Sequence, residues 1–217
     1  MRAAGLPPLI LISDAARVGE ERFLDALRAA IEGGLRMVQV REPSWTLGDV
    51  RRLLQRVKET AARGPAAGRF RIVVNRSLAL ALELGLDGLH LGGGDPAALT
   101  GARTALGHGP LLGYSAHSGE EIGAASLRGA DYVSLSPIYG AISKRHPLPP
   151  LGLEALGAAC GTATVPVYAL GGVEPRHAAE LRRAGAAGGA MIGGILDAPD
   201  PGQAARGFID AWEAARA

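Results

Sequence analysis

Short apolar segments alternate with longer segments of helical character along the whole sequence, and this alternation limits the folds open to the chain. Eight segments rich in Val, Ile and Leu are predicted to be strands. They cover residues 9–12, 37–41, 71–75, 88–91, 111–114, 132–136, 167–170 and 189–192. Amphipathic helices are predicted between them, most clearly over 21–31, 47–62, 120–127, 176–184 and 203–215. Strands that alternate with helices in this way indicate a parallel sheet.

Glycine supports this division, because four predicted helices end in Gly shortly before the next strand. These are Gly34, Gly85, Gly129 and Gly185, at the position where a helix end adopts a left-handed conformation. Eight strand and helix units fit within 217 residues without a break in composition. We therefore expect residues 1–217 to form a single (β/α)8 TIM-barrel domain rather than an open doubly wound sheet.

The amino-acid composition limits the kinds of partner that the protein is expected to bind. Lys and Arg exceed Asp and Glu by only two, and they are scattered, so we expect no nucleic-acid partner. The single cysteine, Cys160, allows no intrachain disulfide and is predicted to be a small buried apolar residue. No apolar run reaches the roughly 20 residues that span a bilayer, and we expect no membrane partner and a cytoplasmic location. The sequence leaves a homo-oligomer open.

A parallel barrel brings the residues after each strand to one mouth, and this rule selects the candidate site residues. The polar candidates at that mouth are Arg41, Asn75, Ser115, His117 and Lys144. Asp87 and Asp131 precede strands, so they are predicted to be structural residues at the opposite end. The segment 146–150, from His146 to Pro150, is a candidate mobile loop over the site.

Several of these residues have a structural interpretation beside the functional one. Imidazole is the side chain best suited to proton transfer near neutral pH, so His117 is the best acid-base candidate, but it could instead be a loop or capping histidine. Arg41 could clamp an anion or pair with Glu42. His90, within a strand, is predicted to fill the barrel interior with its hydrogen bonds satisfied.

Two glycine pairs follow the last two predicted strands. Gly171 and Gly172 follow the seventh, and Gly193 and Gly194 follow the eighth. Barrels often bind phosphate on backbone N–H groups at these two strands, where glycine permits a close approach. Each pair alone could be a tight turn, but together they predict a phosphate-binding site.

The motifs at these strand ends resemble the superfamily of thiamine phosphate synthase and the thiazole tautomerase TenI. The resemblance covers nearly the whole chain. Its motifs are VQVREPS from Val38, VVNRSLALALELGLDGLHLGGGDP from Val73, LLGYSAHS from Leu111, GADYVSLSPIYGAISK from Gly129 and PVYALGGV from Pro166. Several motifs in the family's order are more specific than the fold alone.

The two branches of this superfamily imply different chemistry. The synthase joins a pyrimidine pyrophosphate to a thiazole phosphate and is expected to hold Mg²⁺ through oxygen ligands. Here Arg76 stands at one carboxylate position of the synthase pattern, while Asp95 stands at another. Pro43 and Gly193 also replace polar residues of that pattern, and Lys144 is retained. The sequence alone does not determine what Arg76 does, including whether it pairs with Glu42.

These departures favour the tautomerase branch, an isomerase that aromatises a phosphorylated carboxythiazole without a cofactor. Under this hypothesis His117 moves the proton, Arg41 and Lys144 orient the carboxylate end, and the four glycines bind the phosphate of this small thiazole ligand. Three alternatives stay open. They are a divergent Mg²⁺-dependent thiamine phosphate synthase that uses Asp95, a non-catalytic barrel that binds thiazole or thiamine phosphate, and another phosphate-binding barrel enzyme.

Overall fold

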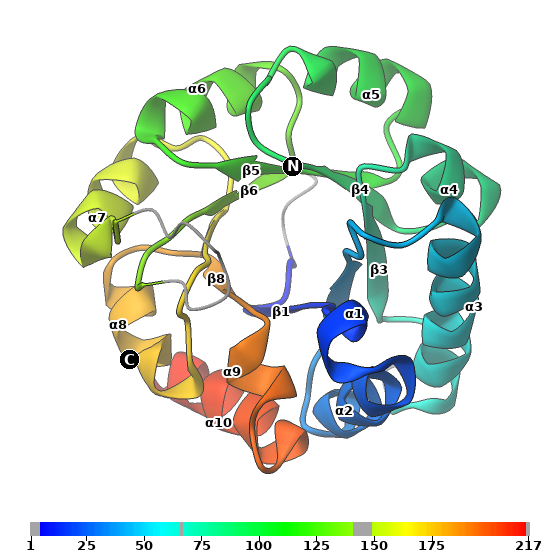
Figure 1. The fold of residues 1–217 in the computed structure, drawn as a ribbon. Helices are drawn as coiled ribbons and strands as arrows, with labels where there is room; N and C mark the ends of the chain where they lie inside the picture. Colours follow the sequence, from blue (N-terminus) through cyan, green and yellow to red (C-terminus); the bar gives the residue numbers. More distant parts are fainter. Residues whose placement is uncertain (1–4, 66, 141–148, 216–217) are drawn as a thin grey trace.

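Eight parallel strands close into a barrel, with the helices arranged around the outside (Figure 1). The computed structural model describes residues 5–65, 67–140 and 149–215. The strands pair in chain order, and β8 pairs with β1 to complete the barrel. The strands are β1 Leu9–Ile12, β2 Met37–Val40, β3 Arg71–Asn75, β4 Gly88–Leu91, β5 Leu111–Ala116, β6 Tyr132–Leu135, β7 Val167–Ala169 and β8 Gly188–Met191. The predicted (β/α)8 barrel is therefore confirmed.

The outer layer contains more helices than the sequence pattern marked. The α-helices are α1 Ala15–Val18, α2 Glu20–Glu32, α3 Leu47–Arg63, α4 Leu78–Glu83, α5 Ala98–Leu106, α6 Gly119–Leu127, α7 Gly152–Thr162, α8 Ala178–Arg183, α9 Gly193–Leu196 and α10 Pro201–Ala214. The helix predicted over 176–184 is split, because a 3-10 turn, η1 Pro175–His177, precedes α8. Each predicted strand is present, with small shifts at its ends.

Alternation along the strands divides the apolar side chains into two groups. Outward-facing strand residues such as Leu11, Val38 and Val133 pack against the helices in the main core. Inward-facing residues form a smaller cluster that includes Tyr132 and Tyr168, whose rings meet edge to face at 5.8 Å. These rings fill the barrel below the carboxyl ends of the strands, so the interior is a packed core and the open space lies above it.

Charged side chains fix the loops at the amino-terminal end of the strands. Asp87 accepts a hydrogen bond from the Ile72 N–H at 2.8 Å. Asp131 accepts one from the Leu112 N–H at 2.8 Å and pairs with Arg103. Both aspartates thus join neighbouring strands, as the sequence predicted for structural residues at this end. The carboxyl ends remain available for a site.

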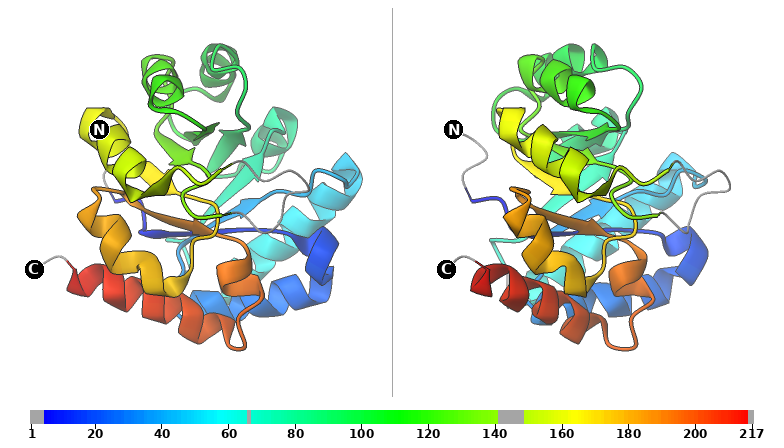
Figure 2. Two further views of the ribbon diagram at one scale, coloured as in Figure 1. Left: turned by 60° about the vertical axis from the view of Figure 1, so that its left-hand side comes forward. Right: turned by 90° about the vertical axis from the view of Figure 1, so that its left-hand side faces the viewer.

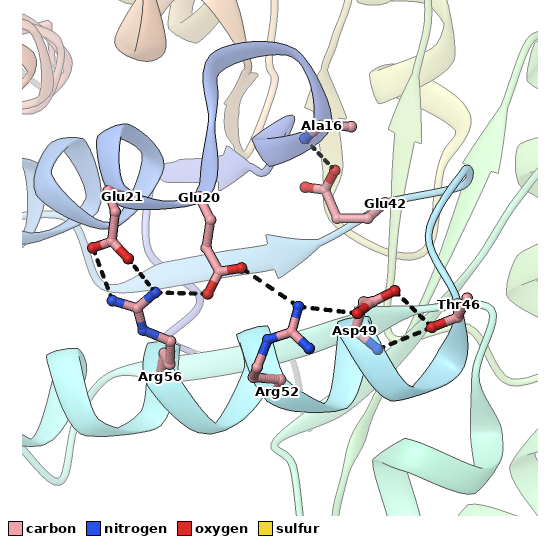
Figure 3. Close-up of polar contacts among 8 residues, drawn as sticks. All are labelled: Ala16, Glu20, Glu21, Glu42, Thr46, Asp49, Arg52 and Arg56. Carbon is pink, nitrogen blue, oxygen red and sulfur yellow. Dashed lines mark hydrogen bonds and ion pairs between the residues drawn. The ribbon is translucent and has the colours of Figure 1, made fainter.

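An ion-pair network on the outer surface joins α2 to α3 (Figure 3). The Arg56 guanidinium contacts Glu20 at 2.7 Å and Glu21 at 2.6 Å. Hydrogen bonds to these two carboxylates raise the pKa of Arg56 above its ordinary value. Because the network is exposed, its value lies mainly in fixing the orientation of the two helices.

The last helix completes the outer layer beside the first long one. Figure 2 shows α10, in red, running alongside α2, in blue, and the two helices are in direct contact. Phe208 and Trp212 of α10 are buried there. Across the described residues, every helix is too short or too polar to cross a membrane.

Candidate functional site

A cavity of about 1430 Å³ opens at the carboxyl ends of the strands. It brings together most of the residues that the barrel rule selected: Arg41, Asn75, Ser115, His117, Gly171, Gly172, Gly193 and Gly194. Lys144 and most of the segment 146–150 lie outside the described residues. Asp95 is described and exposed, but it does not line the cavity. The roles assigned to these residues remain predictions.

His117 follows β5 and directs one ring nitrogen to the protein and the other to the cavity. Its Nδ1 lies 2.8 Å from the carbonyl oxygen of Ser136, so Nδ1 carries a hydrogen and donates it. Nε2 faces Gly93, where an added Cβ would lie 3.3 Å from it. The helix that follows is capped by Ser118, which accepts from the Glu121 N–H at 3.2 Å. His117 is therefore not the capping residue, and its Nε2 remains able to meet a ligand.

A chain of hydrogen bonds runs across the cavity floor through His90. Its Nδ1 lies 3.1 Å from the Tyr132 hydroxyl, and its Nε2 lies 2.9 Å from Ser115 Oγ. Burial, and secondarily the nearby Arg41 charge, lowers the pKa of His90 to about 3, so the ring is neutral. A side chain at Gly113 would collide with the rings of His90 and Tyr132, which explains the glycine at this position of β5.

The direction of this chain follows from the donors. The Tyr132 O–H has no other hydrogen-bond partner among the described residues, so we assign it as the donor to Nδ1 of His90. Nε2–H then donates to Ser115, whose own O–H is left to point into the cavity. The sequence correctly placed His90 in the interior. The sequence did not indicate that His90 would orient the Ser115 hydroxyl, because this orientation depends on hydrogen bonds among residues of β4, β5 and β6.

Two arginines, Arg41 and Arg76, follow the neighbouring strands β2 and β3. Glu42 is not their partner. Its buried carboxylate accepts from Ser13 Oγ at 2.6 Å and from the Ala15 and Ala16 N–H groups at 2.8 and 2.9 Å, the last of which Figure 3 shows. Glu42 thus holds the start of α1, which rules out the pairing with Arg41 considered from the sequence. Both guanidinium groups are exposed at the cavity.

The glycine pairs lie at β7 and β8. Gly171 and Gly172 have φ values of 89° and 69°, in the left-handed region. A Cβ on Gly171 would lie 2.7 Å from Pro137, and one on Gly194 would lie 2.7 Å from the carbonyl oxygen of Val173. Gly193 and Gly194 begin α9, whose first N–H groups have no partner within the helix. The glycines therefore serve the local packing whether or not they also bind phosphate.

Arginine, histidine, serine and glycine around one cavity at the strand ends of a closed parallel barrel are typical of the sites of barrel enzymes. The comparisons with known proteins identify the group within that class. Residues 9–195 match the family model described as thiamine monophosphate synthase. The chain belongs to this family.

Relatives over most of the chain have synthase names. A protein of Geobacter sulfurreducens named "Putative thiamine-phosphate synthase" is 37% identical over 207 residues, covering 93% of this chain and 92% of that protein. The "Thiamine-phosphate synthase" of Anaeromyxobacter dehalogenans is 40% identical over 190 residues, covering 88% and 83%. The solved thiamine phosphate pyrophosphorylase of Pyrococcus furiosus is similar in fold, with a TM-score of 0.82 at 24% identity over 96% of each chain.

These relatives overturn the tautomerase hypothesis and, with it, the isomerase class. Similarity at this level to proteins named as synthases favours the transferase branch. The error has a physical origin. The hypothesis relied on a few exchanged residues, such as Arg76 and Gly193, which line the cavity. Exchanges among lining residues can change how an anion is held while the barrel and its reaction stay the same.

The family resemblance implies a magnesium ion, but the described residues do not form a carboxylate site for it. Mg²⁺ is usually held by one or two carboxylates together with substrate phosphates and water. Four carboxylates line the cavity, and each is engaged: Asp14 and Asp197 with Arg17, Glu42 with α1, and Glu174 with Arg176. Asp95, outside the lining, accepts from the Ala97 N–H at 2.8 Å. No group of three potential metal ligands occurs within the described residues.

Proposed function

We propose that this protein is a thiamine-phosphate synthase that joins hydroxymethylpyrimidine pyrophosphate to thiazole phosphate. The observation that carries the proposal is a large cavity with two separate regions suited to anions. Arg76 follows β3, whereas Gly171 and Gly172 follow β7, which lies opposite β3 in a closed barrel of eight strands in chain order. A volume of about 1430 Å³ exceeds the roughly 300–1,000 Å³ usual for one small ligand. Two phosphorylated substrates fit this arrangement better than one.

The reaction needs the two substrates held with their reacting atoms together. The thiazole nitrogen gives its electron pair to the pyrimidine methylene carbon, forming the C–N bond. The bond from that carbon to the pyrophosphate oxygen breaks, and pyrophosphate leaves with the electron pair. Negative charge therefore grows on the departing oxygen, and fixed positive charges placed there lower the barrier. Arg41, at the end of β2, is suited to this position.

The remaining residues are assigned to positioning. The Gly171, Gly172, Gly193 and Gly194 backbone N–H groups would hold the thiazole phosphate. Asn75 and the cavity-directed Ser115 hydroxyl would hydrogen-bond the pyrimidine substrate. His117 presents Nε2 at the cavity, where its protonated form would donate to a phosphate oxygen. None of these steps passes through a protein carboxylate.

The proposal is tested by incubating the purified protein with both substrates and following thiamine phosphate and pyrophosphate together. One arm contains Mg²⁺ and the other contains EDTA. Formation of the two products in equal amounts, in either arm, supports the synthase. If thiazole phosphate binds but neither arm gives thiamine phosphate, the proposal fails and a binding protein is the better description.

A further inference from the structure

Arg76 has an unusual backbone for a residue with a side chain. Its φ is 62°, and it is the one non-glycine residue in the left-handed region within the described part of the chain. Its N–H donates to the carbonyl oxygen of His90 at 2.9 Å, which ties it to the neighbouring strand. A left-handed residue with a Cβ is strained. Glycine at position 76 would remove the strain. The arginine side chain is therefore expected to contribute something that offsets this strain.

The side chain of Arg76 lies against a glycine that leaves room for it. A Cβ on Gly92, at the end of β4, would lie 2.6 Å from Nη2 of Arg76 and 2.8 Å from its Nε. Gly92 does not itself need glycine for its φ, which is outside the left-handed region. The absence of a side chain at 92 therefore lets the guanidinium lie across the end of β4, at the cavity.

No carboxylate among the described residues neutralises this guanidinium. Arg17, at the same cavity, pairs with Asp14 at 2.7 Å and Asp197 at 2.8 Å. Arg76 has no ion pair or side-chain hydrogen bond with any described residue. Arg41 follows the adjacent strand, where Val40 and Val74 are in register. Two cations thus face one cavity from neighbouring strands, and neither pairs with a carboxylate in the part of the chain that the structure describes.

We propose that Arg76 binds the pyrophosphate of the pyrimidine substrate directly, together with Arg41, and supplies the positive charge that a carboxylate-held divalent ion would otherwise supply. The inference rests on the proposed function. A planar guanidinium forms paired, charge-assisted hydrogen bonds with phosphate oxygens. As the methylene carbon releases pyrophosphate with its bonding electrons, this charge stabilises the departing oxygens.

The test measures binding of inorganic pyrophosphate by calorimetry in buffer that contains EDTA. The wild-type protein is expected to bind without metal. Arg76→Gly should weaken the affinity roughly 10- to 100-fold, the range for a lost charge-assisted contact. It should melt at or above the wild-type temperature, because glycine relieves the left-handed strain. Arg76→Lys, which keeps the charge without the paired geometry, should fall between the two.

Two further variants separate this role from a general effect of charge. Gly92→Ala keeps Arg76 but pushes its guanidinium aside, so it should also weaken pyrophosphate binding several-fold. Arg63→Ala removes one positive charge from the far end of α3 and should change the affinity less than twofold. The inference is overturned if pyrophosphate binds only when Mg²⁺ is added, or if Arg76→Gly binds as the wild type does.

The two proposals can fail separately. Pyrophosphate binding through Arg76 without formation of thiamine phosphate would refute the synthase and leave the anion site standing. Thiamine phosphate formation that requires Mg²⁺ and is unaffected by Arg76→Gly would refute the role of Arg76 and leave the synthase standing.

Discussion

At the scale of single residues, His90 links the cavity to the pH dependence of stability. Its pKa is lowered to about 3 in the folded protein, whereas an unfolded histidine titrates near 6.5. The unfolded chain therefore takes up a proton between these values that the folded chain refuses. The free energy of unfolding therefore has its full value above about pH 6.5 and decreases as the pH falls toward 3.

The expected size of this effect is on the order of 2 kcal/mol between pH 8 and pH 5. Urea unfolding at the two pH values, for the wild type and for His90→Gln, measures it. The wild type should lose more stability in acid than the variant by about this amount. Equal losses would show that His90 is protonated in the folded protein.

A second prediction at this scale concerns His117. His117→Asn keeps a side-chain amide that can donate to the Ser136 carbonyl but removes the nitrogen that faces the cavity. Under the synthase proposal, kcat should fall roughly 10- to 100-fold, since a charge-assisted contact to phosphate is lost. The melting temperature should barely change, because the local hydrogen bond survives. Steady-state kinetics beside thermal unfolding check both parts, and an unchanged kcat would remove His117 from the reaction.

At the scale of elements, the contact between α2 and α10 is close enough to require glycine. Gly33 ends α2, and a Cβ there would lie 2.2 Å from the carbonyl oxygen of Gly202 at the start of α10. Gly33→Ala should therefore lower the free energy of unfolding by about 1–3 kcal/mol, the usual effect of forcing an extra group into a packed contact.

The matched control is Gly101→Ala in the middle of α5, where an added Cβ meets nothing within 4 Å. Alanine is the better helix former, so this variant should gain up to about 1 kcal/mol. Denaturant unfolding of the two variants distinguishes the effects. Similar changes in both would mean that α2 and α10 move apart at little cost.

The secondary-structure elements also show which parts of the fold and the site could be predicted from the sequence. Strands were predictable because buried parallel strands give dense apolar runs, and the site followed from their order. Short helices such as α4 and α9 were missed because one or two turns give no clear helical period. The position of the Arg76 guanidinium could not be foreseen either. It depends on a left-handed backbone and on Gly92 in the neighbouring strand, and neither is visible in a local pattern.

For the whole molecule, closure of the sheet into a barrel predicts that the barrel unfolds as one unit. Pairing of β1 with β8 leaves none of the eight described strands at an open edge. The two tryptophans report on distant regions. Trp45 lines the cavity, while Trp212 is buried in α10, with its ring 5.8 Å from Phe208 and 5.1 Å from the Arg182 guanidinium.

Unfolding in denaturant should therefore give the same midpoint for both tryptophans. Trp45→Phe leaves Trp212 as the fluorescent probe, and Trp212→Phe leaves Trp45. In each variant the fluorescence midpoint should coincide with the loss of helical circular dichroism. A Trp45 transition at lower denaturant than the dichroism would show that the cavity end opens before the barrel.

The charged side chains at the cavity are separate from the apolar side chains that hold the helices to the barrel, and this separation bears on how such a protein can change over generations. Leu11, Val38 and Val133 hold the helices to the barrel, whereas Arg41, Arg76 and His117 lie beyond the strand ends. A lineage can therefore exchange a metal-binding carboxylate for a guanidinium without first acquiring mutations that restore folding. Descendants with the same barrel can inherit one reaction and still differ in the ions they need for it.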